Sequence, residues 1–147
     1  MELDFVPVAF HLGDSGYLTY AAAWGGKPDF EPFSRVASVE NGSDWVAILA
    51  RRLRKKANQA PGAFPEDPLD VLRRNVWVTP YYEEDLAALS ATIGVERILF
   101  GSDWPHGEGL AEPLTFSKEL TAFAPDEVRM IMRDNVIDLL GGVTASE

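Results

Sequence analysis

The chain has 147 residues, of which 46% are hydrophobic and 24% are charged, and this composition is typical of one globular domain rather than of a disordered or fibrous chain. Thirteen basic and 23 acidic residues give a net charge of -10, which disfavours binding to nucleic acid or to anionic membranes. The absence of cysteine excludes a disulfide framework and a thiolate metal site, so His, Asp and Glu remain as candidate metal ligands. No leader-like segment or long apolar run is present, and we expect a cytoplasmic protein.

Four short apolar runs predict β-strands. They are rich in Val, Ile or Phe and cover Val6–Phe10, Arg35–Val39, Val76–Thr79 and Ile98–Phe100. Because these runs are mostly apolar rather than alternating, we expect strands that are buried on both faces, as in a parallel sheet.

Helical patterns lie between and after these runs. They predict helices over Ser43–Lys56, Glu83–Ile93, Leu114–Phe123 and Asp126–Leu140, with a proline-containing loop over Ala57–Pro68. The first helix is expected to turn Trp45, Ile48, Leu49 and Leu53 inward, and the last one Val128, Ile131, Met132, Val136, Leu139 and Leu140.

The alternation of strands and helices predicts an α/β fold built from right-handed β-α-β units. The units belong either to an open doubly wound sheet or to a segment of a barrel. The stretch between His11 and Arg35 lacks a sustained helical stripe, so this first unit is shortened, either by a functional loop or by an internal deletion.

Polar residues follow each predicted strand. His11 follows the first, Glu40 the second, Tyr81 and Tyr82 the third, and the pair Asp103 and His106 the fourth. If the strands are parallel, all of these side chains emerge at the carboxyl edge of the sheet, where α/β proteins bind ligands.

Each of these residues has a functional and a structural interpretation. Asp103 could bind a cation and accept a proton from metal-bound water, or it could cap a turn. Similarly, His11 is either a metal ligand or a histidine bonded to the loop backbone, and His106 either ligates, moves a proton or anchors its loop. Glu40 is a ligand, a base or a turn residue, and Tyr81 and Tyr82 line a pocket or simply pack.

Two segments carry a resemblance to a known family. The motif ILFGSDWPH, followed further on by DEVRMIMRDNVIDLLG, resembles the end of the amidohydrolase-related metal-dependent hydrolases, a group that includes the aminocarboxymuconate-semialdehyde decarboxylase-like enzymes. The resemblance implies a (β/α)8 TIM-type barrel in which Asp103 is a metal ligand and proton acceptor. The segment PVAFHLG is similar to the family's fifth strand, so His11 would ligate the metal, whereas Glu40 stands where the sixth strand usually ends in His.

The resemblance covers the C-terminal half of such a barrel, as one partial domain over residues 1–147. It implies a hydrolase or non-oxidative decarboxylase of a small organic substrate, using zinc or, alternatively, manganese, with Tyr81, Tyr82, Trp104 and His106 shaping the pocket. The paired histidines expected after the first strand are missing, so we expect the chain alone to be inactive. The alternative is a non-catalytic barrel remnant or interaction module. Unpaired sheet edges in either case predict a homo-oligomer or an aggregate.

Overall fold

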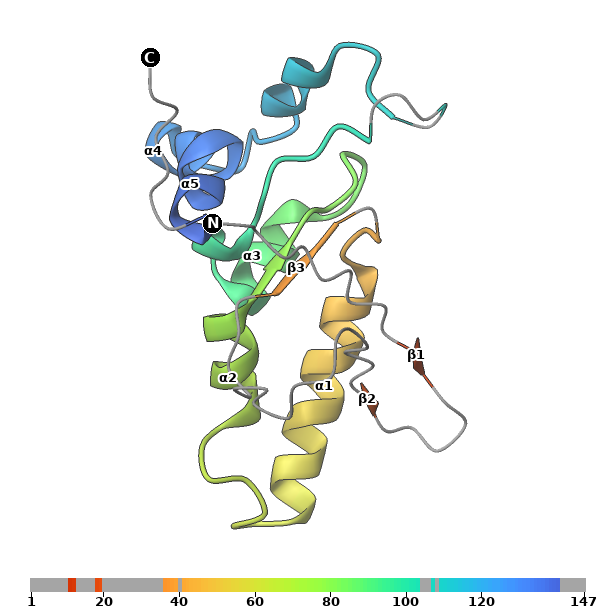
Figure 1. The fold of residues 1–147 in the computed structure, drawn as a ribbon, viewed down its shortest axis with the longest axis vertical. Coiled ribbons are helices and arrows are strands. Elements are labelled where there is room, and N and C mark those ends of the chain that lie inside the picture. Colours follow the sequence, from red (N-terminus) through yellow and green to blue (C-terminus); the bar gives the residue numbers. More distant parts are fainter. Residues whose placement is uncertain are drawn as a thin grey trace, which may run out of the picture.

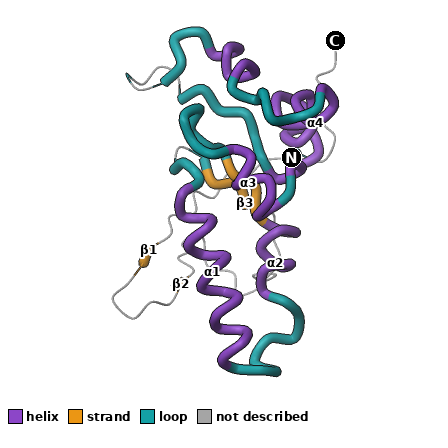
Figure 2. The backbone as a smooth tube through the Cα atoms, turned by 180° about the vertical axis from the view of Figure 1, so that it is seen from behind, coloured by secondary structure: helices purple, strands orange, loops and turns teal. Residues whose placement is uncertain are grey.

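A computed structural model of the chain describes residues 11–12, 18–19, 36–39, 41–103, 107 and 109–140. Its central feature is a small parallel sheet with helices packed against it (Figure 1). The helices α1 and α2 extend toward one end of the molecule, and α4 and α5 lie at the other (Figures 1 and 2). No helix among the described residues combines the length and the apolarity needed to cross a bilayer.

The sheet consists of β3 (Val36–Ser38) and β4 (Val76–Val78), extended by a parallel bridge between Val78 and Ile98. The N–H of Thr79 donates to the carbonyl of Ser38 (2.9 Å), and the N–H of Leu99 donates to that of Val78 (2.8 Å). The predicted parallel pairing of the second, third and fourth strands is therefore confirmed, although the fourth is reduced to a single bridge.

The first predicted strand, Val6–Phe10, lies outside the described residues. A different strand, β1 (His11–Leu12), pairs antiparallel with β2 (Leu18–Thr19) in a separate two-stranded sheet.

The register gives the parallel sheet two distinct faces. Val78 pairs with Ser38 and bridges to Ile98, and side chains of paired residues point to the same face. Val76, Val78 and Ile98 join the core beneath the helices, together with buried residues that include Val46, Leu69, Leu72, Leu86, Leu89, Ile93 and Ile131. Ala37 and Trp77 occupy the opposite face, where the guanidinium of Arg97 stacks 4.3 Å from the centre of the Trp77 ring.

Helix α1 (Asp44–Gln59) follows β3 as predicted but ends three residues later than expected. It buries Val46 and Ala50, while Ile48, predicted to face inward, is 42% exposed. Helix α3 (Leu86–Ile93) begins three residues after its predicted start, because the Asp85 carboxylate accepts a hydrogen bond from the Ala88 N–H and caps the first turn there (2.9 Å).

Helix α2 (Pro68–Asn75) was not predicted. Its start carries recognisable signals, because the Asp67 side chain accepts from the Leu69 N–H (2.8 Å) and a proline occupies the first turn. The helix buries Leu69 and Leu72 and leads directly into β4.

The C-terminal part is helical, but not as one regular α-helix. The segment predicted over Leu114–Phe123 forms a 3₁₀ helix at Pro113–Lys118, and the predicted Asp126–Leu140 helix consists of α4 (Pro125–Arg129), a π-helix at Met130–Asp134 and α5 (Asn135–Leu139). Ile131 is buried as predicted. Val136, however, is 39% exposed and Asn135 is buried instead.

The π-helix changes what the C-terminal segment does for the sheet. The Asn135 N–H donates to the Met130 carbonyl, five residues back, rather than to that of Ile131. The Ile131 carbonyl instead accepts from the N–H of Phe100 (3.1 Å). The Asn135 side-chain amide adds a hydrogen bond to the Ile98 carbonyl (2.7 Å). The backbone N–H of Leu99 points toward β4, so the backbone groups of Ile98 and Phe100 point toward the opposite edge. The helical segment therefore covers that edge.

Candidate functional site

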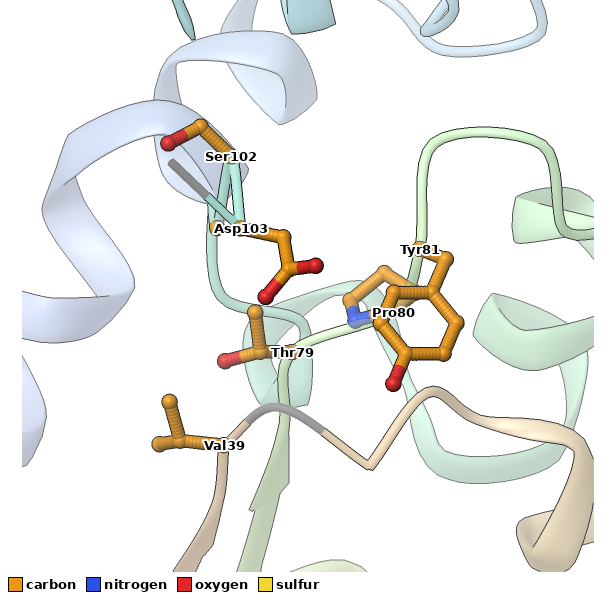
Figure 3. Close-up of a pocket in the computed structure, with 7 residues that line it drawn as sticks. Val39, Thr79, Pro80, Tyr81, Ser102 and Asp103 are labelled. Atoms are coloured by element: carbon orange, nitrogen blue, oxygen red, sulfur yellow. The ribbon is translucent and has the colours of Figure 1, made fainter. Parts of the chain in front are cut away.

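A pocket of about 210 Å³ lies at the carboxyl ends of the parallel strands. It is lined by Val39, Thr79, Pro80, Tyr81, Gly101, Ser102 and Asp103, which follow β3, β4 and the Ile98 bridge (Figure 3). Val39 and Thr79 continue the sheet face that carries Ala37 and Trp77. The pocket therefore occupies the edge of the sheet at which the sequence predicted a ligand site.

Asp103 has an unusual backbone conformation within this pocket. Its φ of 55° lies in the left-handed region, which among non-glycine residues Asn and Asp adopt most readily. The following loop returns to this point, since the Leu110 N–H donates to the Ser102 carbonyl (2.9 Å) and Gly109 contacts the Asp103 carbonyl so closely that a Cβ there would overlap it. Figure 3 shows the Asp103 carboxylate directed into the pocket and the Ser102 hydroxyl directed away from it.

The floor of the pocket is tightly packed. A Cβ added to Gly101 would overlap the methyl group of Thr79. The two strand ends therefore lie so close together that only glycine fits at position 101. Thr79 is buried and Asp103 lies above it, while Pro80 and Tyr81 form the neighbouring wall (Figure 3). The pocket thus combines one carboxylate with a mostly apolar and aromatic lining.

Glu84, which the sequence did not single out, connects the loop after β3 to the loop after β4. Its carboxylate accepts hydrogen bonds from the Ser43 N–H (2.9 Å to each oxygen), the Ser43 hydroxyl (2.7 Å) and the Tyr81 N–H (2.9 Å). The available sequence signal was a Ser before a helix start, which favours a capping role. In the structure Ser43 makes no side-chain cap and donates to Glu84 instead.

The predicted site residues differ in how far the structure places them. Asp103 and Tyr81 line the same pocket, whereas Tyr82 is 36% exposed and is not among the lining residues. His11 lies in β1, and only its backbone is described. The predictions for Glu40, Trp104 and His106 concern positions outside the described residues.

The described residues alone do not form a metal site. Among them, no three His, Asp or Glu side chains gather in an arrangement that could hold a cation. The residues that line the pocket include one carboxylate residue, Asp103, together with Thr79 and Tyr81, while the Ser102 hydroxyl points away from the pocket. A cation at this position would therefore require ligands from elsewhere in the chain or from another chain.

The parallel sheet and its helices define the class as an α/β protein, and the pocket lies at the strand ends, where proteins of this class generally bind ligands. Comparison with known proteins identifies the family within that class. The amidohydrolase family model matches residues 7–142, and the chain belongs to this family.

A solved structure gives the same result. The crystal structure of an amidohydrolase from Mycobacterium avium subsp. paratuberculosis K-10 is 58% identical in sequence and superposes with a TM-score of 0.70. The match covers 73% of this chain but only 28% of the relative, so this chain spans little more than a quarter of the relative's length. A search of curated proteins found no match.

Proposed function

We propose that this chain supplies one part of the active site of a metal-dependent amidohydrolase, with Asp103 as a metal ligand and the acceptor of a proton from water. The carrying observation is the position of Asp103, whose carboxylate enters the pocket at the carboxyl ends of β3, β4 and the Ile98 bridge from a left-handed backbone conformation. Strained backbone of this kind clusters at active sites and ligand clamps.

The proposed cation is divalent, zinc first and manganese second, because imidazole and carboxylate ligands suit both. His11 and Glu40 are the proposed further ligands, and the rest of the set would come from outside this chain. When bound, the cation would polarise the substrate and lower the pKa of water. Tyr81, which lines the pocket, together with Tyr82, Trp104 and His106, is proposed to contact a small organic substrate.

Two reactions suit such a site. Hydrolysis is the reaction for which family membership provides support. Non-oxidative decarboxylation, as in the aminocarboxymuconate-semialdehyde decarboxylase-like enzymes, is the second candidate, and it rests on the resemblance of the ILFGSDWPH segment alone.

A non-catalytic role is the competing proposal. It is favoured by the single carboxylate that the described residues bring to the pocket. A barrel remnant or interaction module would keep the fold and the pocket but would not bind zinc at Asp103.

Zinc binding to the purified chain separates these proposals. We would measure it by equilibrium dialysis and elemental analysis for the wild type, for Asp103→Asn and for Asp126→Asn. Asparagine tolerates the left-handed backbone, so Asp103→Asn removes the charge and keeps the loop. Asp126 is an exposed carboxylate at the start of α4 and serves as the matched control.

Loss of a group that only orients a metal ligand weakens metal binding by roughly 10–100-fold. Asp103→Asn removes a proposed ligand itself, so we expect it to weaken zinc binding by at least this factor. Asp126→Asn should bind like the wild type. Equal affinity in all three proteins would show that Asp103 is not a ligand. A wild type without zinc affinity would favour the non-catalytic role.

A further inference from the structure

We propose that Glu84 is a positioning residue that holds Tyr81 against the pocket by joining the loop after β3 to the loop after β4. The inference deepens the proposed function, since Tyr81 is the aromatic wall of that site. The contacts that carry it belong to the described residues and do not depend on a bound metal.

The Glu84 carboxylate accepts hydrogen bonds from donors in both loops. Ser43, 41 residues earlier in the chain, provides its N–H and its hydroxyl, and Tyr81 provides its N–H. Ser43 is only 7% exposed and Glu84 is half-buried, so these bonds are partly shielded from water. Hydrogen bonds to a charged carboxylate are stronger than those between neutral groups, particularly where water is excluded.

Gly42 allows this arrangement to close. Its φ of 57° lies in the left-handed region, and a Cβ at this position would lie 2.5 Å from Glu84 Oε1 and 2.8 Å from the Tyr81 ring. The Gly42 backbone is therefore in close contact with both side chains. The Trp45 indole N–H donates to the Gly42 carbonyl (3.0 Å) and fixes the same turn from the other side.

The Glu84 carboxylate is not needed to start the next helix. Asp85 performs that task, since its side chain accepts from the Ala88 N–H at the first turn of α3. Within the described part of the chain, the four hydrogen bonds that the Glu84 carboxylate accepts all come from the loops at the strand ends. Its effect should therefore be local to Tyr81 and Ser43 rather than spread through α3.

The test compares Glu84→Gln with Glu83→Gln in the full chain, without added metal. Glutamine has the shape of glutamate, but it turns an NH₂ group toward a cluster of donors. Glu83 is an exposed neighbour and provides the matched control. The measurements are NMR amide hydrogen exchange at every residue, the ring signals of Tyr81 and the melting temperature.

We expect Glu84→Gln to accelerate exchange at the Ser43 and Tyr81 amides at least about 10-fold, reflecting the loss of charge-assisted bonds. The Tyr81 ring signals should shift, while amides near the end of α3, such as that of Ile93, keep their protection. Glu83→Gln should match the wild type. A Glu84→Asp variant, whose shorter side chain keeps the charge, should restore part of the protection at Tyr81.

Unchanged exchange at Ser43 and Tyr81 in Glu84→Gln would overturn the proposal. So would an equal acceleration throughout α3, because it would make Glu84 a general stability residue. If Glu84→Gln does not fold, Ser43→Ala removes one donor and should produce a smaller change at the same two residues; no change there would also contradict the proposal. Because this test is made without zinc, a wild type that fails to bind zinc would favour the non-catalytic role without affecting this result.

Discussion

Asn135 is a buried polar side chain that hydrogen-bonds the backbone at the edge of the Ile98–Phe100 segment. It is 4% exposed, and its amide donates to the carbonyls of Ile98 (2.7 Å) and Val95 (2.9 Å). Substitution by Ala would deprive the buried Ile98 carbonyl of this donor and leave a small void. We expect Asn135→Ala to lower the free energy of unfolding by about 2–4 kcal/mol, measured by urea denaturation.

Asn58, exposed near the end of α1, offers a control for this prediction. Its replacement by Ala should change the stability by less than about 0.5 kcal/mol, as is usual at the surface. If Asn135→Ala has an equally small effect, the contact between Asn135 and the strand edge does not stabilise the fold.

Individual site residues were predictable where one local pattern determined their position. Asp103 was identified because it follows an apolar run, and the structure places it at the strand end. Glu84 was not identified, because its role depends on Ser43, which is remote in sequence, and on the left-handed turn at Gly42. No local pattern of the sequence specifies such a contact.

Among the elements, α1 and α3 were predicted, whereas α2 and the π-helix were not. Helix α2 begins at Pro68, a residue that the sequence assigned to the preceding proline-containing loop, so its start signals were attributed to that loop. The π-helix depends on the Phe100 N–H, which bonds the Ile131 carbonyl from a strand remote in sequence. For the same reason the assignment of inward residues failed at Val136, while it held at Ile131.

The loop before α2 is tied to that helix by an ion pair that should respond to pH. Glu66 and Arg74 form two hydrogen bonds of 3.0 and 2.8 Å. The bond to Arg74 lowers the pKa of Glu66 below its ordinary value of 4.5. A lowered pKa in the folded state means that the pair stabilises the fold above pH 4.5, and that this contribution disappears as the pH falls through the lowered value.

We therefore expect Glu66→Gln to be slightly less stable than the wild type at neutral pH and equally stable in acid. Both side chains are solvent-exposed, so the difference should also shrink as salt is added. Thermal melts over a range of pH and ionic strength measure it. A difference that persists or grows below the folded pKa of Glu66 would contradict the assignment to this pair.

For the whole molecule, the parallel sheet has two edges of different character. The edge at Ile98–Phe100 is covered by the C-terminal helical segment through Ile131 and Asn135. On the opposite side, β3 pairs with β4 alone within the described part of the chain. The expectation of unpaired sheet edges is therefore wrong at Ile98–Phe100, because a helix can cover an edge that the strand pattern leaves open. The edge expected at Val6–Phe10 lies outside the described residues.

The β3 edge leads to the last prediction, which concerns association. Val39 directly follows β3 and is 49% exposed. Among the described residues β3 has no second neighbour, and an open strand edge is a site where another chain can pair. We expect sedimentation velocity to show species larger than the 16.2 kDa monomer, with a proportion that rises with concentration.

Val39→Lys should shift the chain toward the monomer, because lysine on an edge opposes pairing. Leu114, which is 76% exposed on the 3₁₀ helix, provides the control, since Leu114→Lys should leave association through β3 unchanged. A wild type that stays monomeric at every concentration, or an equal response to both substitutions, would show that the β3 edge does not mediate association.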